Sequence, residues 1–269
     1  MIECYLDSFV CERFKNDVRY REGHLRVINA LPTRRVLGLH TPDMKRIAKE
    51  LSIRGAVVSM PWGDVLCSCG AEVLRCFEQV APHSLSYEET MVWGFLINNG
   101  RYSDEERFAM LSRFVPVMDN WAVCDAYCAD AKWMARTDKE RLWSYLQPWF
   151  NSGREFEVRF ALVVSMCRLL CDGWVDRVFA RIDRLDFGAI ESAYRTIQSR
   201  AKNVQDGCVQ GAAPYYVRMG CAWLLATALA KYPERTRAFV NSSSLPADVV
   251  KLYVRKARES FRTRMVEAI

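Results

Sequence analysis

Helix-capping pairs recur along the chain, and they constrain its fold more than any other feature of the sequence. In a capping box, a Ser or Thr and a Glu three residues later satisfy the first free N–H groups of a helix. Three stretches have this spacing, namely Ser86/Glu89, Ser103/Glu106 and Thr137/Glu140. An apolar helical pattern follows each pair, so a helix is predicted to begin at each of these positions.

Further helices are predicted around these three. One has Thr41 as its cap, Pro42 at the first helical position and a stop at Gly55. Two others, residues 154–171 and 213–233, are long and largely apolar. No alternating β-branched segments are identified on the two sides of a hairpin turn, so a sheet is not expected.

Helices therefore recur every roughly 16 to 22 residues, from the N-terminus to about Arg262. Paired antiparallel helices of this length build HEAT-like solenoids, which are curved and offer a concave surface to an extended partner. The sequence is predicted to form such an all-α, HEAT-like helical-repeat solenoid, as a single domain over residues 1–269. An ordinary helical bundle is the alternative, and periodicity alone does not separate the two.

Composition narrows the class of protein. A chain of 269 residues that is 51% hydrophobic can bury a large core. No apolar run reaches the roughly 18 residues that a membrane span needs, and the acidic start with Glu3 and Asp7 does not fit a signal peptide. A cytoplasmic protein is expected. The eleven cysteines are interpreted as reduced thiols that pack as small hydrophobic side chains, and with three histidines they do not favour a metal site.

Trp121 and Asp125 lie four residues apart, in a predicted helix that follows a polar cap. Residues at positions i and i+4 share one helix face, so the indole and the carboxylate point into the same space. An unpaired carboxylate is costly to bury. The pair therefore favours a site for a flat, cationic ligand.

Basic residues gather near helix ends and along the last helix. The net charge of +6 permits an acidic partner such as nucleic acid without requiring one. Cations distributed over a helical stack fit a phosphate backbone, while a solvated helix face is the alternative. The residues are Arg34, Arg35, Lys45, Arg46, Lys49, Arg154, Arg200 and Lys202, followed in the last helix by Lys251, Arg255, Lys256, Arg258, Arg262 and Arg264.

Two large side chains stand out within the long apolar helices. Arg159 is a cation in an apolar segment, so it needs a partner or a phosphate. Trp223 is a large aromatic residue in another apolar segment, and packing in the core is the alternative to a functional role for it.

Four motifs occur in the order, and with roughly the spacing, seen in AlkD-like DNA alkylation repair proteins. They are LGLHTPDMKRIAKE, FVPVMDNWAVCD, EFEVRFALVV and YYVRMGCAWLLATALAKYPE. The sequence resembles this family from about Val36 to Arg262. The resemblance implies a HEAT-like solenoid and a monofunctional DNA glycosylase of base excision repair. Such enzymes release 3-methyladenine and 7-methylguanine, both positively charged, from duplex DNA without a metal or cofactor.

The resemblance also assigns roles to individual residues. Trp121 and Asp125 match the family's aromatic–carboxylate pair and Trp223 its second tryptophan, which makes these three the catalytic candidates. The residues assigned to DNA binding are Arg159, which would hold a phosphate, with Arg154, Lys45, Arg46, Arg258 and Arg262. The chain departs from the family at Ala122, Cys124 and Ala226, where an acid, a valine and a backbone-contacting arginine are typical. These departures imply fewer backbone contacts or another lesion preference.

The sequence is therefore interpreted as a monomeric glycosylase for cationic alkylpurines in duplex DNA. Two other functions stay open, a non-catalytic HEAT-like module that binds DNA and a protein–protein scaffold. Convergence of Trp121, Asp125 and Trp223 on one basic concave surface would favour the enzyme or the DNA-binding module. Buried tryptophans, with Asp125 on the convex side, would favour the scaffold.

Overall fold

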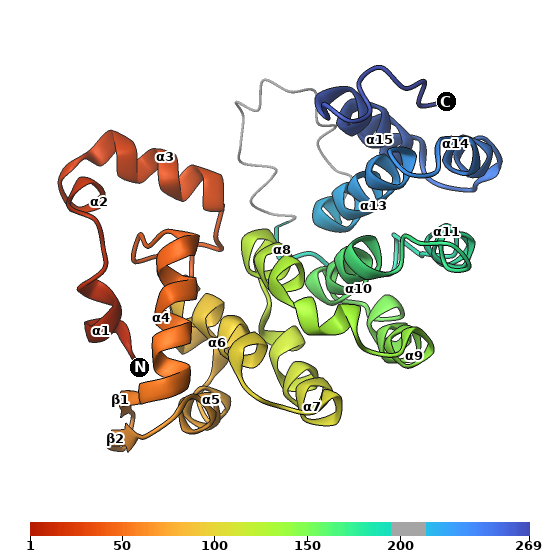
Figure 1. Ribbon diagram of the computed structural model, residues 1–269. Coiled ribbons are helices and arrows are strands. Elements are labelled where there is room, and N and C mark those ends of the chain that lie inside the picture. The colour runs from red at the N-terminus through yellow and green to blue at the C-terminus, as the bar shows by residue number, and fades with distance from the viewer. Residues whose placement is uncertain (195–213) are drawn as a thin grey trace. The chain divides into compact units, whose positions relative to one another are not determined.

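The chain folds into helices joined by short connections, and these form two compact units, unit 1 (residues 1–136) and unit 2 (residues 137–269) (Figure 1). The computed structural model describes residues 1–194 and 214–269. In this part of the chain all elements are helices apart from one short two-stranded hairpin, so the all-α prediction is confirmed. The assignment of a single domain stays a prediction.

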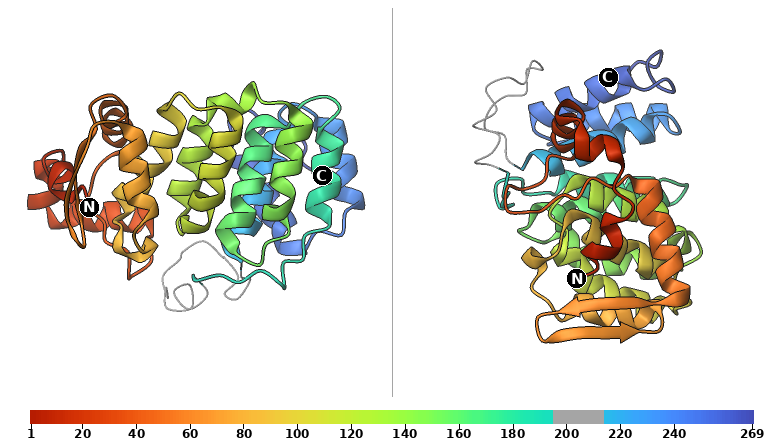
Figure 2. Two further views of the ribbon diagram at one scale, coloured as in Figure 1. Left: turned by 90° about the horizontal axis from the view of Figure 1, so that it is seen from below. Right: turned by 90° about the vertical axis from the view of Figure 1, so that its left-hand side faces the viewer.

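Unit 1 contains two rows of helices. The helices α4, α6 and α8 pack side by side in one row, while α5 and α7 pack against α6 from the other (Figure 2). The bounds are α1 (Glu3–Asp7), α2 (Glu12–Asn16), α3 (Val18–Ile28), α4 (Thr41–Arg54), α5 (Gly70–Glu78), α6 (Tyr87–Asn99), α7 (Asp104–Phe114) and α8 (Trp121–Asp130), with strands β1 (Ala56–Met60) and β2 (Gly63–Cys67) and the short 3-10 turns η1 (Pro82–Ser84), η2 (Val115–Val117) and η3 (Lys132–Ala135).

Unit 2 repeats this two-row arrangement. The helices α10, α13 and α15 form one row, with α9 packed against α10 and α14 against α13. The bounds are α9 (Lys139–Phe150), α10 (Glu155–Arg168), α11 (Val175–Asp183), α13 (Tyr215–Leu229), α14 (Pro233–Ser242) and α15 (Ala247–Glu259). The recurrence of paired helices in both units is the pattern of a helical repeat. No helix in the described residues is long and apolar enough to cross a membrane.

The helix starts predicted from capping residues are correct to within one residue, whereas α13 begins two residues later and α15 four residues earlier than predicted. Both capping boxes of unit 1 form, because the Ser86 and Ser103 side chains accept the N–H groups of the glutamates three residues later. The cap predicted at Thr137 is wrong, since the Asp138 carboxylate accepts the Arg141 N–H at 2.8 Å and begins α9 instead. A carboxylate also complements the positive end of the helix dipole.

The helix predicted from Thr41 begins one residue earlier than expected. His40 is its N-cap and Thr41 is its first helical residue. The predicted stop is confirmed, because Gly55 has a φ of 67° and a Cβ at this position would lie 1.9 Å from the carbonyl oxygen of Cys67. Only glycine tolerates both conditions.

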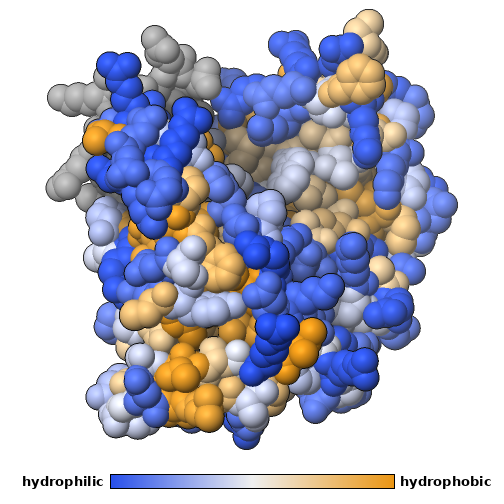
Figure 3. All heavy atoms as spheres, turned by 60° about the vertical axis from the view of Figure 1, so that its left-hand side comes forward, coloured by the Kyte–Doolittle hydropathy of each residue, from blue (hydrophilic) through white to orange (hydrophobic). Residues whose placement is uncertain are grey.

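The absence of a sheet is a wrong prediction. β1 and β2 form an antiparallel hairpin in which Val57 pairs with Leu66 and Val58 with Val65. β-branched residues do flank the Pro-Trp-Gly turn, where Gly63 has a φ of 127°, but five-residue strands are too short to display a clear alternation. Val57 and Leu66 are exposed, and hydrophobic side chains reach the surface over this hairpin at the bottom of Figure 3.

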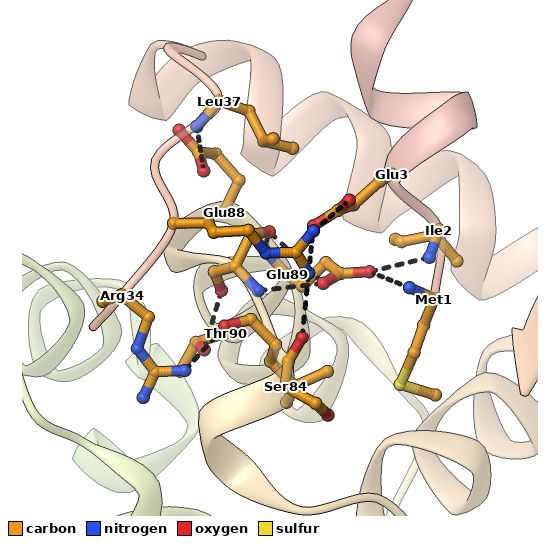
Figure 4. Close-up of polar contacts among 12 residues, drawn as sticks. Met1, Ile2, Glu3, Arg34, Leu37, Ser84, Glu88, Glu89 and Thr90 are labelled. Carbon is orange, nitrogen blue, oxygen red and sulfur yellow. Dashed lines mark hydrogen bonds and ion pairs between the residues drawn. The ribbon is translucent and has the colours of Figure 1, made fainter. Parts of the chain in front are cut away.

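Two buried acids attach the N-terminal segment of unit 1 to α6 (Figure 4). Glu88 accepts the N–H groups of Leu37 and Gly38 at 2.9 and 2.8 Å. Glu89 accepts the Ile2 N–H at 2.7 Å. Both side chains are fully buried, and buried carboxylates are stable only when such donors surround them. The segment between α3 and α4 is thereby held close to α6.

The last helix is shorter than predicted. α15 ends at Glu259, so Arg262 and Arg264 lie in the turns that follow it. The Thr263 hydroxyl donates to the Ala257 carbonyl at 2.7 Å and is buried. This contact folds the chain back over the final turn of the helix, whose terminal carbonyls would otherwise lack donors.

Candidate functional site

The first candidate residues lie on a narrow surface stripe of α8. Trp121 and Asp125 are half-buried and occupy the same face of the helix, whereas Val123, Cys124 and Tyr127 are buried. The other residues of the stripe are Ala122, Ala126 and Ala129. Alanines have the smallest side chains available for a helix surface. The tryptophan and the carboxylate therefore project from a face that offers little competing bulk.

Trp121 is held by the end of α3. Its indole Nε1 donates to the Ile28 carbonyl at 3.0 Å, and the neighbouring Asn120 side chain donates to the same oxygen at 2.9 Å. Asn120 is also the N-cap of α8, with its Oδ1 accepting the Ala122 N–H at 2.8 Å. The polar cap was expected from the sequence, but its contact with α3 was not.

Arg34 and Asp119 form an ion pair directly before α8, with 2.6 Å between Nη2 and Oδ2. The Nη1 atom of Arg34 donates to the carbonyls of Pro82 and Leu85 at 2.7 and 2.8 Å. Burial raises the pKa of Asp119, and the charge of Arg34 opposes that shift. Arg34 thus connects three segments of unit 1, a role that its position near a helix end did not indicate.

In unit 2, Arg159 lies against the start of α13. Its side chain is 3% exposed, and Nη1 donates to the Tyr216 carbonyl at 2.5 Å. Glu155, one turn earlier on α10, accepts the N–H of the same residue at 2.7 Å. Burial raises the pKa of Glu155, while Ser192, Tyr216 and Arg159 counteract it. The two charged residues therefore bind the N–H and the carbonyl of one residue of α13, and the predicted phosphate contact of Arg159 stays a prediction.

Trp223 lies on the solvent-facing side of α13. It is 37% exposed, although the residues on both sides of it, Ala222 and Leu224, are fully buried. Core packing, the alternative for this residue, does not describe its position. Ala226, about one turn later, is buried within unit 2.

The predicted DNA-binding cations of α4 and α10 are engaged with acids. Lys45 contacts Asp130, the last residue of α8, with 2.7 Å between Nζ and Oδ1. Arg46 pairs with Asp43 at 3.1 Å within its own helix. Arg154 pairs with Glu157 at 2.8 Å. The three cationic side chains are 43 to 63% exposed, although Asp130 and Glu157 are only 22 and 11% exposed.

The cations at the end of the chain lie around a shallow hollow. Lys251, Arg255 and Arg258 line it together with apolar residues of α15 and Ile269, and its volume is about 500 Å³. Arg258 and Arg262 are exposed. The predicted cations Arg200 and Lys202 lie outside the described residues.

The candidates fall into two pairs, one in each unit. Trp121 and Asp125 share one face of α8 in unit 1. In unit 2, Arg159 is buried and contacts α13 at Tyr216, whereas Trp223 of the same helix is exposed. Convergence of both pairs on one surface stays a prediction. Across residues 1–194 and 214–269, no group of three or more His, Cys, Asp or Glu side chains is arranged to hold a metal ion.

Comparison with known proteins places these residues in a family. A sequence model of the family described as DNA alkylation repair enzyme matches residues 22–261, which cover both units and both candidate pairs. No curated protein and no solved structure shows a significant match to the chain.

Proposed function

Because this chain belongs to the DNA alkylation repair enzyme family, which supports a role in DNA alkylation repair, we propose that it is a monofunctional DNA glycosylase for positively charged N-alkylpurines. The observation that carries the proposal is the stripe on α8, where a half-buried indole and a half-buried carboxylate share one face between alanines. An aromatic face attracts a cation, and so does a carboxylate. Together they suit a flat ligand with a positive charge.

The proposed reaction is hydrolysis of the N-glycosidic bond of the damaged nucleotide. An N-alkylated purine is cationic and leaves as a neutral base once it takes the electrons of the bond to C1′. The sugar then carries the positive charge, in an oxocarbenium-like transition state, until a water oxygen bonds to C1′ and releases one proton to the solvent. Asp125 stabilises that charge and orients the water, the task that carboxylates perform in glycoside hydrolysis.

The tryptophans and the cations have separate tasks in this proposal. Trp121 and Trp223 offer aromatic faces to the cationic nucleotide, each worth about 0.5 to 2 kcal/mol. Exposed cations such as Arg258 and Arg262 bind phosphates irrespective of base sequence. Binding to duplex DNA should therefore weaken with salt, with the logarithm of affinity falling by about 0.9 per phosphate contact for each unit of log salt.

The proposal is tested by replacing Asp125 with Asn. The amide keeps the shape of the side chain and removes the charge, so single-turnover release of 7-methylguanine from methylated duplex DNA should fall about 100- to 1000-fold. DNA affinity, measured in parallel by fluorescence anisotropy, should be retained. Asp130→Asn is the matched control, because Asp130 lies on the same helix but pairs with Lys45.

Three results would change the assignment. Should the wild-type protein bind methylated DNA but release no base above the spontaneous rate, a non-catalytic DNA-binding module becomes the better account. A protein that binds DNA without any salt dependence would instead remove both DNA functions and leave the scaffold. If Asp125→Asn releases base as fast as wild type, Asp125 is not the catalytic carboxylate.

A further inference from the structure

One buried amide joins the ends of two helices in unit 1. The Asn120 side chain is 1% exposed and has a different partner at each end of its amide group. Oδ1 accepts the Ala122 N–H at 2.8 Å and caps the start of α8, whereas Nδ2 donates to the Ile28 carbonyl at 2.9 Å and caps the end of α3. The orientation of the amide follows from these partners. The reverse orientation would place Oδ1 against the Ile28 carbonyl oxygen and Nδ2 against the Ala122 N–H.

The indole of Trp121 converges on the same carbonyl. Nε1 donates to the Ile28 oxygen at 3.0 Å, and a carbonyl oxygen with two lone pairs can accept both donors. This carbonyl lies at the C-terminus of α3, where oxygens lack intrahelical donors and carry the negative end of the helix dipole. α3 ends here because Asn29 adopts the left-handed conformation, with φ 50° and ψ 48°.

The hydrogen bond from the Trp121 indole N–H to the Ile28 carbonyl determines the direction of the half-buried ring. A tryptophan side chain rotates about two bonds, and the helix backbone restricts mainly the first of them. A hydrogen bond at the nitrogen of the indole fixes the second rotation as well. The position of the ring therefore depends on where the Ile28 carbonyl lies relative to the first turn of α8, and Asn120 spans those two points directly.

A second contact supports the same junction without touching the ring. Asp119, directly before Asn120, forms the half-buried ion pair with Arg34, which also binds the carbonyls of Pro82 and Leu85. Three consecutive residues, Asp119, Asn120 and Trp121, thus contact the segment between residues 28 and 34. The Asn120 side chain joins the carbonyl that holds the indole to a backbone N–H in the first turn of α8.

We propose that Asn120 is the positioning residue for Trp121, and that it acts by holding the Ile28 carbonyl where the indole N–H can bind it. The inference rests on the proposed function for its consequence, since a fixed ring matters to the reaction only if Trp121 faces the damaged nucleotide. Asn120 itself does not contact the substrate. It sets the angle at which the aromatic face meets the cation.

The test separates this task from the capping of α8. Asn120→Ser retains an oxygen that can accept an N–H of the first turn, but it removes the amide donor to Ile28. Asn120→Asp also retains the cap and places a carboxylate against the Ile28 carbonyl. A third variant carries the benzothienyl analogue of tryptophan at position 121, which keeps an aromatic ring of similar shape without an N–H. Ser103→Ala is the matched control, because Ser103 caps α7 by the same kind of bond and contacts no residue of α3 or α8 among those described.

The first measurement is single-turnover release of 7-methylguanine, with DNA affinity measured in parallel. Asn120→Ser and the benzothienyl variant should each release base about 2- to 30-fold more slowly than wild type, since the contribution of one cation–π contact sets the upper limit of the loss. Their affinity for DNA should stay within about twofold, because phosphate contacts dominate it. Ser103→Ala should match wild type in both measurements.

The second measurement is hydrogen exchange of the Trp121 indole N–H, followed by NMR on protein with ¹⁵N-labelled tryptophan and assigned with Trp121→Phe. The indole N–H should be protected in wild type and in Ser103→Ala, and should exchange faster in Asn120→Ser and Asn120→Asp. General destabilisation would also speed exchange at the buried Trp93, whose rate should stay unchanged.

These outcomes distinguish the inference from the proposed function. Unchanged base release in Asn120→Ser, with an active wild-type protein, overturns the inference and leaves the glycosylase intact. An inactive wild-type protein overturns the proposed function, and the exchange rates then decide the inference alone. Equal protection of the Trp121 indole in wild type and Asn120→Ser would show that Asn120 does not position the ring.

Discussion

Replacing Arg159 with Met should reveal how much of the stability of unit 2 depends on one buried guanidinium. Arg159 is 3% exposed and donates to the Tyr216 carbonyl at 2.5 Å, and the buried Glu155 holds the N–H of the same residue. Methionine fills a similar volume without a charge or a donor. The substitution therefore removes the donor and leaves Glu155 without a cation one helical turn away.

The expected loss follows from these two contacts. A hydrogen bond from a charged donor contributes about 1.5 to 3 kcal/mol, and removing one partner of a buried charge pair costs about 3 to 5 kcal/mol. Glu155 keeps the bonds from the Tyr216 N–H and the Ser192 hydroxyl, and burial raises its pKa, so protonation relieves part of the cost. A total loss of about 3 kcal/mol is expected.

Urea unfolding followed by circular dichroism measures this loss. With a slope of about 2 kcal/mol per molar urea, a loss of this size lowers the unfolding midpoint by about 1.5 M. Arg154→Met is the comparison variant at the N-cap of α10. The Arg154 side chain is 63% exposed and pairs with Glu157 at 2.8 Å, and Glu157 would keep the bond from the Ser152 hydroxyl, so the loss of stability should be smaller than in Arg159→Met.

An unchanged midpoint in Arg159→Met would refute the reasoning. If that variant also lost DNA affinity and showed a smaller salt dependence, Arg159 would be the phosphate ligand that the family resemblance implies, and its contact with Tyr216 would contribute nothing measurable. Loss of stability with normal DNA affinity at low temperature would instead confirm that Arg159 holds α13 in place.

Two further predictions concern Trp223 and Glu88. Trp223→Ala should slow base release by about 10-fold, in line with the loss of one cation–π contact. It should lower stability by only about 1 to 2 kcal/mol, because the ring is 37% exposed. Trp93→Ala, at a ring that is 3% exposed, should cost about 3 to 5 kcal/mol in thermal unfolding. Equal losses of stability would contradict a surface position for Trp223. Burial raises the pKa of Glu88 above its ordinary value of 4.5, against the opposing bonds from the Leu37 and Gly38 N–H groups, so the folded chain binds this proton more tightly than the unfolded chain. The stabilising contribution of Glu88 is therefore complete below about pH 4.5 and is lost as the pH rises through the raised pKa. The difference in unfolding free energy between wild type and Glu88→Gln should shrink over that range. A difference that does not change with pH would contradict the assignment.

Features that depend on residues a few positions apart could be predicted from the sequence. The capping boxes at Ser86 and Ser103 form as predicted, because their bonds join residues three positions apart. The same locality places Trp121 and Asp125 on one face of α8 wherever that helix lies in the fold. The errors were also local and small, such as the shift of the α9 cap to Asp138 and the short hairpin, whose strands offer too few residues for a pattern.

Contacts between residues far apart in the sequence became known from the folded chain. Trp121 binds the Ile28 carbonyl, 93 positions away, and Arg159 binds the carbonyl of Tyr216, 57 positions away. No pattern of residues along the chain predicts such contacts, because they depend on the path of the backbone between the two partners. Trp223 shows the same limit, since an apolar helix favours burial at every position and only its neighbours decide which side meets solvent. The residue types alone identify the charged and aromatic candidates. The carbonyls that bind two of them, those of Ile28 and Tyr216, are identified from the folded chain, in which helix ends lie beside these side chains.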